Sequence, residues 1–237
     1  MNGNRDIVSA TVCNIKQETP STKSFNLVPT RNQIHFRPGQ WVDFFVSING
    51  HQEVAGYSIT SSPYHNSSIS LAVKDIGDDL VTRYIHDSML EGDIVSLNIG
   101  GECTYNLDNG STLLLAGGIG ITPLISIFKY IGEATSHKAL LFHSVSSSKE
   151  FLHQEEIKAL CSQQPNRLFY KQTISRKIKQ LNNVGLGRIT KDTLRALPLS
   201  CFDTVFLCGP NQFISDLSKC LMEIGFNENQ IHYEKWW

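Results

Sequence analysis

The sequence predicts a β plus α/β protein, in which an N-terminal antiparallel Greek-key β-barrel is followed by a doubly wound parallel sheet. Two observations carry this prediction. Short β-rich runs separated by turn residues fill the first part of the chain, and strand-like and helix-like segments alternate in the second part. The pattern changes from short strands to alternating strands and helices at the turn dipeptide Asn109-Gly110. We therefore expect one domain over residues 1–108 and another over residues 109–237.

The predicted barrel strands are rich in Val, Ile, Phe, Trp and Tyr, the residues that favour extended backbone. They are Ile7–Ile15, Ser24–Leu27, Trp41–Ser47, Val54–Thr60, Ser68–Val73 and Ile94–Ile99. Pro, Gly, Asn and Asp separate them, and short strands at this spacing are typical of an antiparallel barrel or sandwich. Between the last two strands, apolar residues recur at helical spacing from Leu80 to Met89 and predict a short helix over 78–90.

The second half begins with Leu113–Ala116, a continuous apolar run of the kind found in strands that are buried on both faces. A helix over Pro123–Ile131 is predicted next. The remaining predicted elements are strand Ala139–Phe142, helix Lys149–Leu160, strand Arg167–Gln172, helix Lys191–Ala196, strand Thr204–Cys208, helix Asn211–Ile224 and strand Ile231–Tyr233. This alternation builds a parallel sheet with helices on both faces.

Composition and charge disfavour several classes of protein. Apolar residues make up 41% and charged residues 18%, as in ordinary globular proteins, and the net charge of −1 gives no reason to expect a nucleic-acid partner. No apolar stretch reaches the ~18 residues of a transmembrane helix. The six cysteines and eight histidines lack the close spacings of zinc or iron–sulfur ligands, so we expect no metal. Without a visible signal or transit peptide, we expect free thiols in a reducing compartment, cytoplasmic or mitochondrial. We also expect a monomer.

The strongest local motif runs from Gly117 to Pro123 and follows the first strand of the second half. Glycines allow positive φ and a close approach of backbone to a ligand, and Pro123 suits the first turn of a helix, with Thr122 as its N-cap. A helix N-terminus at the carboxyl end of a parallel strand attracts anions, so the motif predicts a diphosphate site. A tight structural turn is the alternative. The acid that usually follows the second strand is absent, because His143 and serines follow Phe142.

Two segments of the barrel half could bind a flavin. Tyr57 could stack on the ring while Ser58 donates a hydrogen bond near its N5, although a Tyr-Ser pair in a strand, taken alone, is more often packing plus a solvated hydroxyl. Gly77, Thr82 and Arg83 could bind a phosphate near the start of the predicted helix, and simple helix capping is the alternative.

Cys208 stands between a strand and a helix, in the segment Cys208-Gly209-Pro210. A thiol at a helix N-terminus can have a lowered pKa and act as a nucleophile, whereas a lone cysteine more often fills a buried apolar position. No His or Asp stands nearby in a hydrolase pattern.

Taken in order, these motifs resemble those of the ferredoxin–NADP⁺ reductase superfamily, and within it the oxidoreductase NAD-binding-domain-containing proteins, over essentially the whole chain. The family order is P-G-Q, R-x-Y-S, a G-x-x-S/T phosphate helix, G-D-x-V, G-G-x-G-x-x-P, C-G-P and a terminal E-x-aromatic. The matching segments are Pro38-Gly39-Gln40, Tyr57-Ser58, Gly77 with Thr82, Gly92-Asp93-Ile94-Val95, Gly117 to Pro123, Cys208-Gly209-Pro210 and Glu234-Lys235-Trp236.

The resemblance implies a flavoprotein reductase with FAD and NAD(P)H as cofactors, which passes electrons to an unidentified acceptor, either a carrier protein or a small molecule. The residues implied at the flavin are Tyr57, Ser58, Thr60, Gly77, Thr82 and Arg83. Those implied at the nicotinamide nucleotide are Gly117, Gly118, Gly120, Thr122, Pro123, Ser175, Arg176, Cys208, Gly209 and Pro210. Ser58, Cys208 and Glu234 would assist hydride transfer, and Trp236 would lie near the rings.

Two features leave alternatives open. Ala55 replaces the arginine of R-x-Y-S, which removes a bidentate cation and leaves Arg83 as a possible substitute. A second hypothesis is therefore a nucleotide-binding sensor or scaffold with weak or no flavin binding. Ser175, Arg176 and Lys177 suit the 2′-phosphate of NADPH, but a solvated basic loop has the same residues, so NADH and NADPH both stay open.

Overall fold

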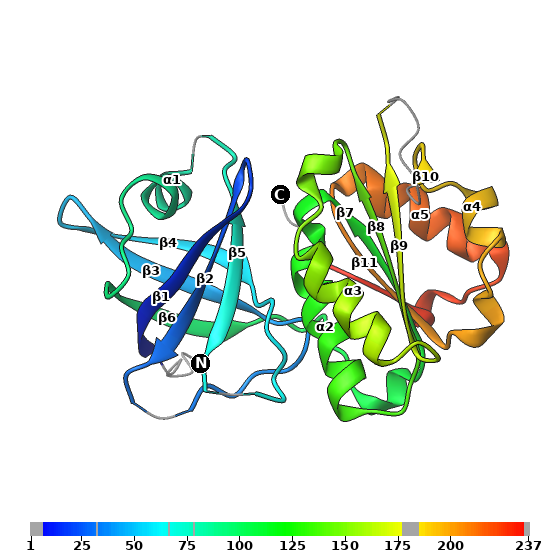
Figure 1. Ribbon diagram of the computed structural model, residues 1–237, viewed down its shortest axis with the longest axis horizontal. Helices are drawn as coiled ribbons and strands as arrows, with labels where there is room; N and C mark the ends of the chain where they lie inside the picture. The colour runs from blue at the N-terminus through cyan, green and yellow to red at the C-terminus, as the bar shows by residue number, and fades with distance from the viewer. Residues whose placement is uncertain (1–6, 32, 66, 78, 177–184, 235–237) are drawn as a thin grey trace.

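The computed structural model describes residues 7–31, 33–65, 67–77, 79–176 and 185–234. It contains a barrel-like antiparallel sheet and, beside it, a parallel sheet covered by helices (Figure 1). The predicted fold class is therefore confirmed. No helix in the described ranges is long and apolar enough to cross a membrane.

The antiparallel sheet runs in the order β4-β3-β6-β1-β2-β5. Its strands are β1 (Val8–Thr19), β2 (Thr22–Pro29), β3 (Trp41–Ile48), β4 (His51–Ser58), β5 (Ile69–Lys74) and β6 (Ile94–Gly100). An antiparallel bridge between Ile59 and Leu71 links the two edges, which closes the sheet into a barrel around an apolar core. All six strands expected from the sequence are found, and the predicted helix is the shorter α1 (Leu80–Asp87), with residue 78 outside the described ranges.

The parallel sheet runs in the order β10-β9-β8-β7-β11-β12. Its strands are β7 (Thr112–Gly117), β8 (Ala139–Val145), β9 (Leu168–Ile174), β10 (Gly185–Leu186), β11 (Thr204–Cys208) and β12 (Ile231–Tyr233). The chain places β8 and β9 on one side of β7, and β11 and β12 on the other. This reversal of direction is a topological switch point, where ligands of doubly wound folds bind at the carboxyl ends of the strands.

Helices cover both faces of the parallel sheet. On the face toward the barrel lie α2 (Ile121–Ala134) and α3 (Gln154–Gln163); on the far face lie α4 (Lys191–Arg195) and α5 (Asn211–Ile224) (Figure 1). The prediction that a helix starts at Lys149 is wrong. A 3-10 turn occupies Ser148–Glu150, and His153 has a left-handed φ of 51°, so α3 begins only after it.

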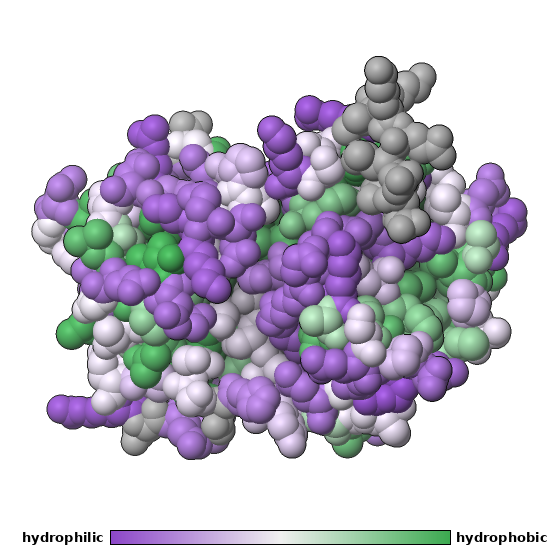
Figure 2. Space-filling view, viewed as in Figure 1, coloured by the Kyte–Doolittle hydropathy of each residue, from purple (hydrophilic) through white to green (hydrophobic). Residues whose placement is uncertain are grey.

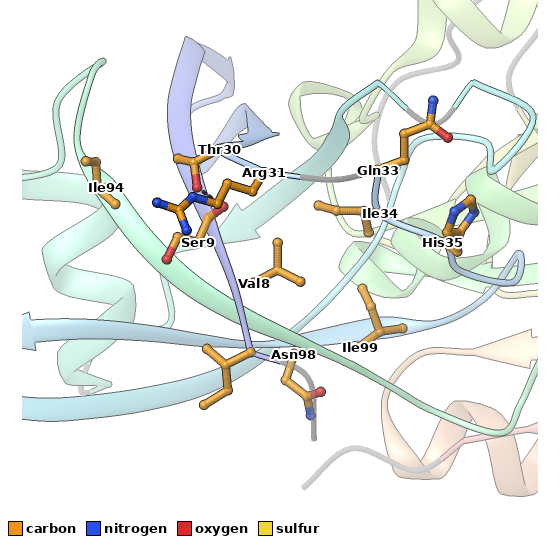
Figure 3. Close-up of a pocket in the computed structure, with 11 residues that line it drawn as sticks. Val8, Ser9, Thr30, Arg31, Gln33, Ile34, His35, Ile94, Asn98 and Ile99 are labelled. Atoms are coloured by element: carbon orange, nitrogen blue, oxygen red, sulfur yellow. Dashed lines mark hydrogen bonds between the residues drawn. The ribbon is translucent and has the colours of Figure 1, made fainter. Parts of the chain in front are cut away.

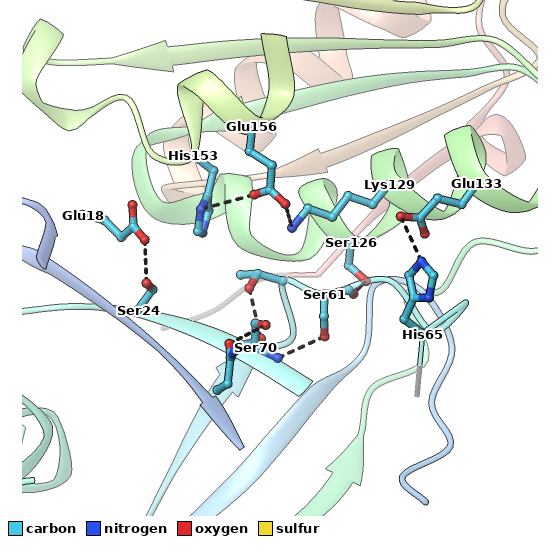
Figure 4. Close-up of polar contacts among 12 residues, drawn as sticks. Glu18, Ser24, Ser61, His65, Ser70, Ser126, Lys129, Glu133, His153 and Glu156 are labelled. Atoms are coloured by element: carbon cyan, nitrogen blue, oxygen red, sulfur yellow. Dashed lines mark hydrogen bonds and ion pairs between the residues drawn. The ribbon is translucent and has the colours of Figure 1, made fainter. Parts of the chain in front are cut away.

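Helix α2 contacts both halves of the protein. It is apolar around most of its surface because it packs on the sheet on one side and on the barrel on the other. Inside this contact, the fully buried Ser126 donates a hydrogen bond of 2.7 Å to the Ser61 carbonyl of the barrel (Figure 4). The hydroxyl thus joins α2 to the segment that follows Tyr57 and Ser58.

A polar cleft of about 800 Å³ lies between the barrel and the start of α3. Hydrophilic side chains predominate along the groove between the halves (Figure 2). Lys129 of α2 pairs with Glu156 of α3 at 2.7 Å, and His153 lies 3.5 Å from the same carboxylate (Figure 4). Burial and the positive charge of Lys129 lower the pKa of His153.

Candidate functional site

The glycine turn after β7 and the Cys-Gly-Pro segment after β11 meet at the switch point. The two strands are hydrogen-bonded neighbours, with Cys208 opposite Ala116. A Cβ atom on Gly120 would lie 2.4 Å from the Cys208 carbonyl oxygen, and one on Gly209 would lie 3.0 Å from the Gly117 Cα. Only glycine fits such a close approach of two backbones. The two motifs that the sequence placed far apart therefore form one edge.

The start of α2 differs from the prediction. Gly118–Gly120 form a 3-10 turn that leads directly into α2, and Gly120 is the N-cap. The prediction that Thr122 is the N-cap is wrong, because Thr122 already lies inside the helix and its hydroxyl donates to the Ile119 carbonyl at 3.0 Å. The 3-10 turn begins within the glycines, so the helical segment starts closer to the strand than predicted. Pro123 does lie in the first turn, as expected.

A cavity of about 370 Å³ opens at this edge. Of the residues singled out by sequence, Gly117, Gly118, Ser175 and Pro210 line it. Arg176 is exposed and does not line it, and Lys177 and Trp236 lie outside the described residues. The volume of the cavity falls within the range of small-molecule binding pockets.

Four charged residues of this cavity were not predicted: Lys74, Glu150, Arg188 and Asp216. Lys74 reaches it from the end of β5 in the barrel, and Arg188 lines it from the segment after β10. Glu150 also lines it, and Ser146 donates to its two carboxylate oxygens at 3.2 and 3.1 Å. No acid directly follows the strand at Phe142 in the sequence, but the 3-10 turn at Ser148–Glu150 brings this one back to the strand end.

A second cluster lies where β11 and β12 end against the barrel. Cys103, Cys208 and Glu234 border one small cavity there. Glu234 accepts a hydrogen bond of 3.3 Å from the indole N–H of Trp41, and burial raises the pKa of this carboxyl group. The Trp41 ring lies so close to Gly100 that a Cβ there would be 2.7 Å away. Trp41 and Cys103 were not predicted as site residues, because no local motif marks them.

The electrostatics of Cys208 disfavour a nucleophilic thiol. The residue is 6% exposed, and burial, reinforced by Cys103 and Glu234, raises its thiol pKa to about 12. A low-pKa nucleophile would need a shift in the opposite direction. Cys208 therefore remains a neutral thiol near pH 7.

On the barrel side, the structure brings Tyr57 and Thr82 together. The Tyr57 phenol oxygen lies 3.0 Å from the Thr82 hydroxyl, and burial raises the pKa of Tyr57. Asp79 is the N-cap of α1 and accepts the backbone N–H of Thr82 at 2.7 Å. Capping therefore accounts for this helix start. Arg83 is exposed, and Gly77 has φ +93° with its N–H bonded to Asp75.

The other predicted flavin residues have partners within the barrel. Ser58 is half-buried and lies opposite Trp41 in the β3–β4 ladder. Thr60 is 1% exposed, and its hydroxyl donates to the Ser70 carbonyl at 3.0 Å. Ala55 packs against the barrel core.

A cavity of about 1030 Å³ lies on the barrel and is lined in part by Val8, Arg31, Ile34 and Asn98 (Figure 3). None of the described residues that were predicted to bind a cofactor or to assist hydride transfer lines it. Among the described residues, too, no three His, Cys, Asp or Glu side chains are grouped to hold a metal ion.

Comparison with known proteins supports the same two halves. Residues 9–104 match the family model described as an oxidoreductase FAD-binding domain, and residues 114–219 match the one described as an oxidoreductase NAD-binding domain. The chain belongs to the ferredoxin–NADP⁺ reductase superfamily. It is an oxidoreductase whose cofactors are FAD and a nicotinamide nucleotide.

Among its relatives is the Homo sapiens oxidoreductase NAD-binding domain-containing protein 1, which is 30% identical over 257 residues, 98% of this chain and 81% of that one. The glycine betaine monooxygenase reductase subunit of Pseudomonas aeruginosa is 26% identical over 226 residues, 92% of this chain and 61% of that one. A solved structure, the flavohem-like FAD/NAD-binding domain of nitric oxide dioxygenase from Vibrio cholerae, has a TM-score of 0.88 at 25% identity, covering 98% of this chain and 99% of that one.

Proposed function

We propose that the protein is an NAD(P)H-dependent flavoprotein reductase, which transfers hydride between a nicotinamide nucleotide and FAD and passes electrons to an acceptor. One observation carries the proposal: the Gly117–Gly120 turn and Cys208 meet at the switch point, beside Glu234 and the barrel residue Trp41. A nucleotide bound along that edge would extend from the 370 Å³ cavity toward the barrel.

The residues present fit a dinucleotide. Gly117 and Gly118 line the cavity just before the start of α2, where the helix dipole favours an anion. Lys74 adds a positive charge from the barrel half. Cys208 and Glu234 would border the place where the two ring systems meet, with the thiol and carboxyl partly shielded from water. A bound flavin supplies the hydride acceptor, and the chain holds the reacting rings in position and excludes solvent.

On the flavin side, Tyr57, Ser58, Thr60, Gly77 and Thr82 keep the roles implied by family resemblance as proposals. The hydroxyls of Tyr57 and Thr82 are hydrogen-bonded to each other, which leaves one of the two hydroxyl hydrogens to donate to a phosphate. A specific observation favours the second candidate, a nucleotide-binding sensor or scaffold without tight flavin binding. Ala55 offers no cation, and the Asp79 carboxylate already occupies the start of α1.

The acceptor, the nucleotide and the assembly are part of the same proposal. A reductase subunit among the relatives favours a separate carrier protein as acceptor, and a small molecule is the alternative. Ser175 and Arg188 line the nucleotide cavity together with Glu150, so both NADPH and NADH find partners there. We further propose a monomer, with the flavin domain in residues 1–108 and the nucleotide domain in residues 109–237.

The test is to incubate the purified protein with FAD, remove free flavin and record the visible absorption bands of bound oxidised flavin. Anaerobic NADH or NADPH should then bleach these bands. A protein that stays colourless and oxidises neither nucleotide, while still binding one of them, would instead support the second candidate, a nucleotide-binding sensor or scaffold.

The variant Ala55→Arg further distinguishes a flavoprotein reductase from a sensor or scaffold without tight flavin binding. If the missing cation limits flavin affinity, Ala55→Arg should lower the dissociation constant for FAD about tenfold, the effect of one charge-assisted hydrogen bond. Ala55→Met is the matched control, since it adds comparable bulk without charge. Equal effects of the two substitutions would mean that the arginine position does not govern flavin binding.

A further inference from the structure

We propose that His143 is a positioning residue for the diphosphate turn: by holding the Gly118 carbonyl inward, it aims the Ile119 N–H at the bound nucleotide. The inference rests on the proposed function, because it assigns a role to a residue behind the proposed diphosphate site. His143 was noted in the sequence only as standing where an acid was expected.

The geometry is direct. His143 lies in β8 opposite Ala116 of β7, and its side chain is 0% exposed. Its Nε2 atom lies 2.9 Å from the carbonyl oxygen of Gly118. Gly118 has φ +55°, the left-handed region, and its carbonyl also accepts the N–H of Ile121. The histidine therefore supports the turn from within the sheet.

The histidine is neutral and its tautomer is defined. Burial lowers the pKa of His143 to about 4, against weaker raising effects of the Gly118 carbonyl and Glu150. Since a carbonyl oxygen only accepts, Nε2 carries the hydrogen and donates it to Gly118. The other ring nitrogen, Nδ1, faces the Tyr170 hydroxyl at 3.5 Å, and that hydroxyl accepts from Gln172 at 3.1 Å. Both ring nitrogens thus have polar neighbours.

The direction of the Gly118 carbonyl decides the direction of the next N–H. In a planar trans peptide, the C=O of one residue and the N–H of the following residue point to opposite sides. With the Gly118 oxygen turned toward His143, the N–H of Ile119 points away from the sheet. Ile119 is half-buried and belongs to the first turn, whose N–H groups have no partner within a helix. Gly118 lines the nucleotide cavity.

Stability alone does not account for a histidine at this position. Its neighbours in β8 include Leu141 and Phe142, and burying an imidazole among them costs more than burying an apolar ring. The Gly118 carbonyl already has the Ile121 N–H as a partner, so the second bond is not needed to satisfy it. What the histidine adds is a fixed orientation of one peptide group at the turn.

The variants His143→Gln and His143→Asn separate position from chemistry. The amide nitrogen of glutamine can take the place of Nε2, whereas that of asparagine takes the place of Nδ1. We expect His143→Asn to raise the dissociation constants of NADH and ADP about tenfold, and His143→Gln to change them less than about twofold. Tyr170→Phe is the matched control, since it removes a hydroxyl on the far side of the ring and makes no contact with the turn.

Calorimetric titration with NADH and ADP gives these constants, and thermal unfolding shows whether each variant is folded. Equal affinities of wild type and His143→Asn, or equal losses in the Asn and Gln variants, would overturn the positioning role while leaving the proposed function intact. A wild-type protein that binds neither NADH nor ADP would refute both the positioning role and the proposed function.

A measurement on the wild type covers the case in which His143→Asn does not fold. The Ile119 amide resonance should shift downfield on ADP binding, and its hydrogen exchange should slow, because a new acceptor reaches it. An Ile119 amide that exchanges equally fast with and without saturating ADP would refute the inference.

Discussion

Replacing Gly120 by alanine tests whether the contact between the two glycine-containing motifs is as tight as the structure indicates. The new methyl group would lie 2.4 Å from the carbonyl oxygen of Cys208, 2.5 Å from its carbonyl carbon and 2.6 Å from the Gly209 nitrogen. All three are backbone atoms, which cannot rotate away as a flexible side chain would.

The size of the effect follows from these distances. Real Cβ atoms approach other heavy atoms no closer than 3.0 Å, so the turn at Gly120 and the end of β11 must move apart until the 2.4 Å approach reaches at least 3.0 Å. Overpacking of this kind costs about 1–3 kcal/mol, and the rigid partner puts Gly120→Ala at the upper end, about 3 kcal/mol. Moving the Gly120 turn and the end of β11 apart also displaces both edges of the nucleotide site, so nucleotide affinity should fall together with stability.

The matched control is Gly118→Ala, which adds the same methyl group two residues earlier in the turn. There the Cβ meets no heavy atom of the described residues within 4 Å, and the cost is only that of placing alanine at φ +55°, about 1 kcal/mol. Urea unfolding of the two variants and the wild type gives the free energies. A Gly120→Ala variant no less stable than Gly118→Ala would refute the reasoning.

Three further outcomes follow from the structure. Ser126→Ala should lower the free energy of unfolding by about 1 kcal/mol, because the Ser61 carbonyl loses its buried donor; an unchanged urea midpoint would argue against that bond. Alkylation near pH 7, followed by mass spectrometry, should label the exposed Cys201 well before the buried, high-pKa Cys208, and comparable rates would contradict its neutral, shielded state. For His143, the folded pKa of about 4 lies below the ordinary 6.5, so the unfolded chain binds the extra proton and stability falls as pH drops from 6.5 to 4, by up to about 3 kcal/mol. In urea titrations across this interval, His143→Gln should lose less stability than wild type; parallel losses would show that the ring does not titrate as proposed.

Most strands and helices could be predicted because their signals are local. The run Thr204–Cys208 and the helix Asn211–Ile224 have the bounds expected from the sequence, since an apolar strand, a Gly-Pro break and a helical period follow one another without ambiguity. The strand β10 was missed because two residues, Gly185–Leu186, are too short to show any period. Helix α3 was predicted to start too early because polar residues from Lys149 onward suit a 3-10 turn as well as a helix.

Only some residues of the candidate site could be predicted from local sequence signals. The glycine turn and the Cys208 segment are marked by glycines and prolines at strand ends, which signal close backbone contacts wherever they occur. Lys74, Trp41 and Glu150 have no such mark, because an ordinary lysine, tryptophan or glutamate gains a role only from what folds against it. The N-cap was misassigned to Thr122 because a helix can start within the glycines themselves.

The sequence by itself determined the order of the elements, the change from barrel to parallel sheet and the presence of a glycine turn at the start of a helix. These depend on hydrophobic period and backbone freedom over a few neighbouring residues. The tertiary structure decided which groups share a site: Lys74 with Gly118 at one cavity, Trp41 with Glu234, and His143 beneath the turn. Those contacts join residues far apart in the chain, and they form only when two sheets and α2 pack together, which no local pattern encodes.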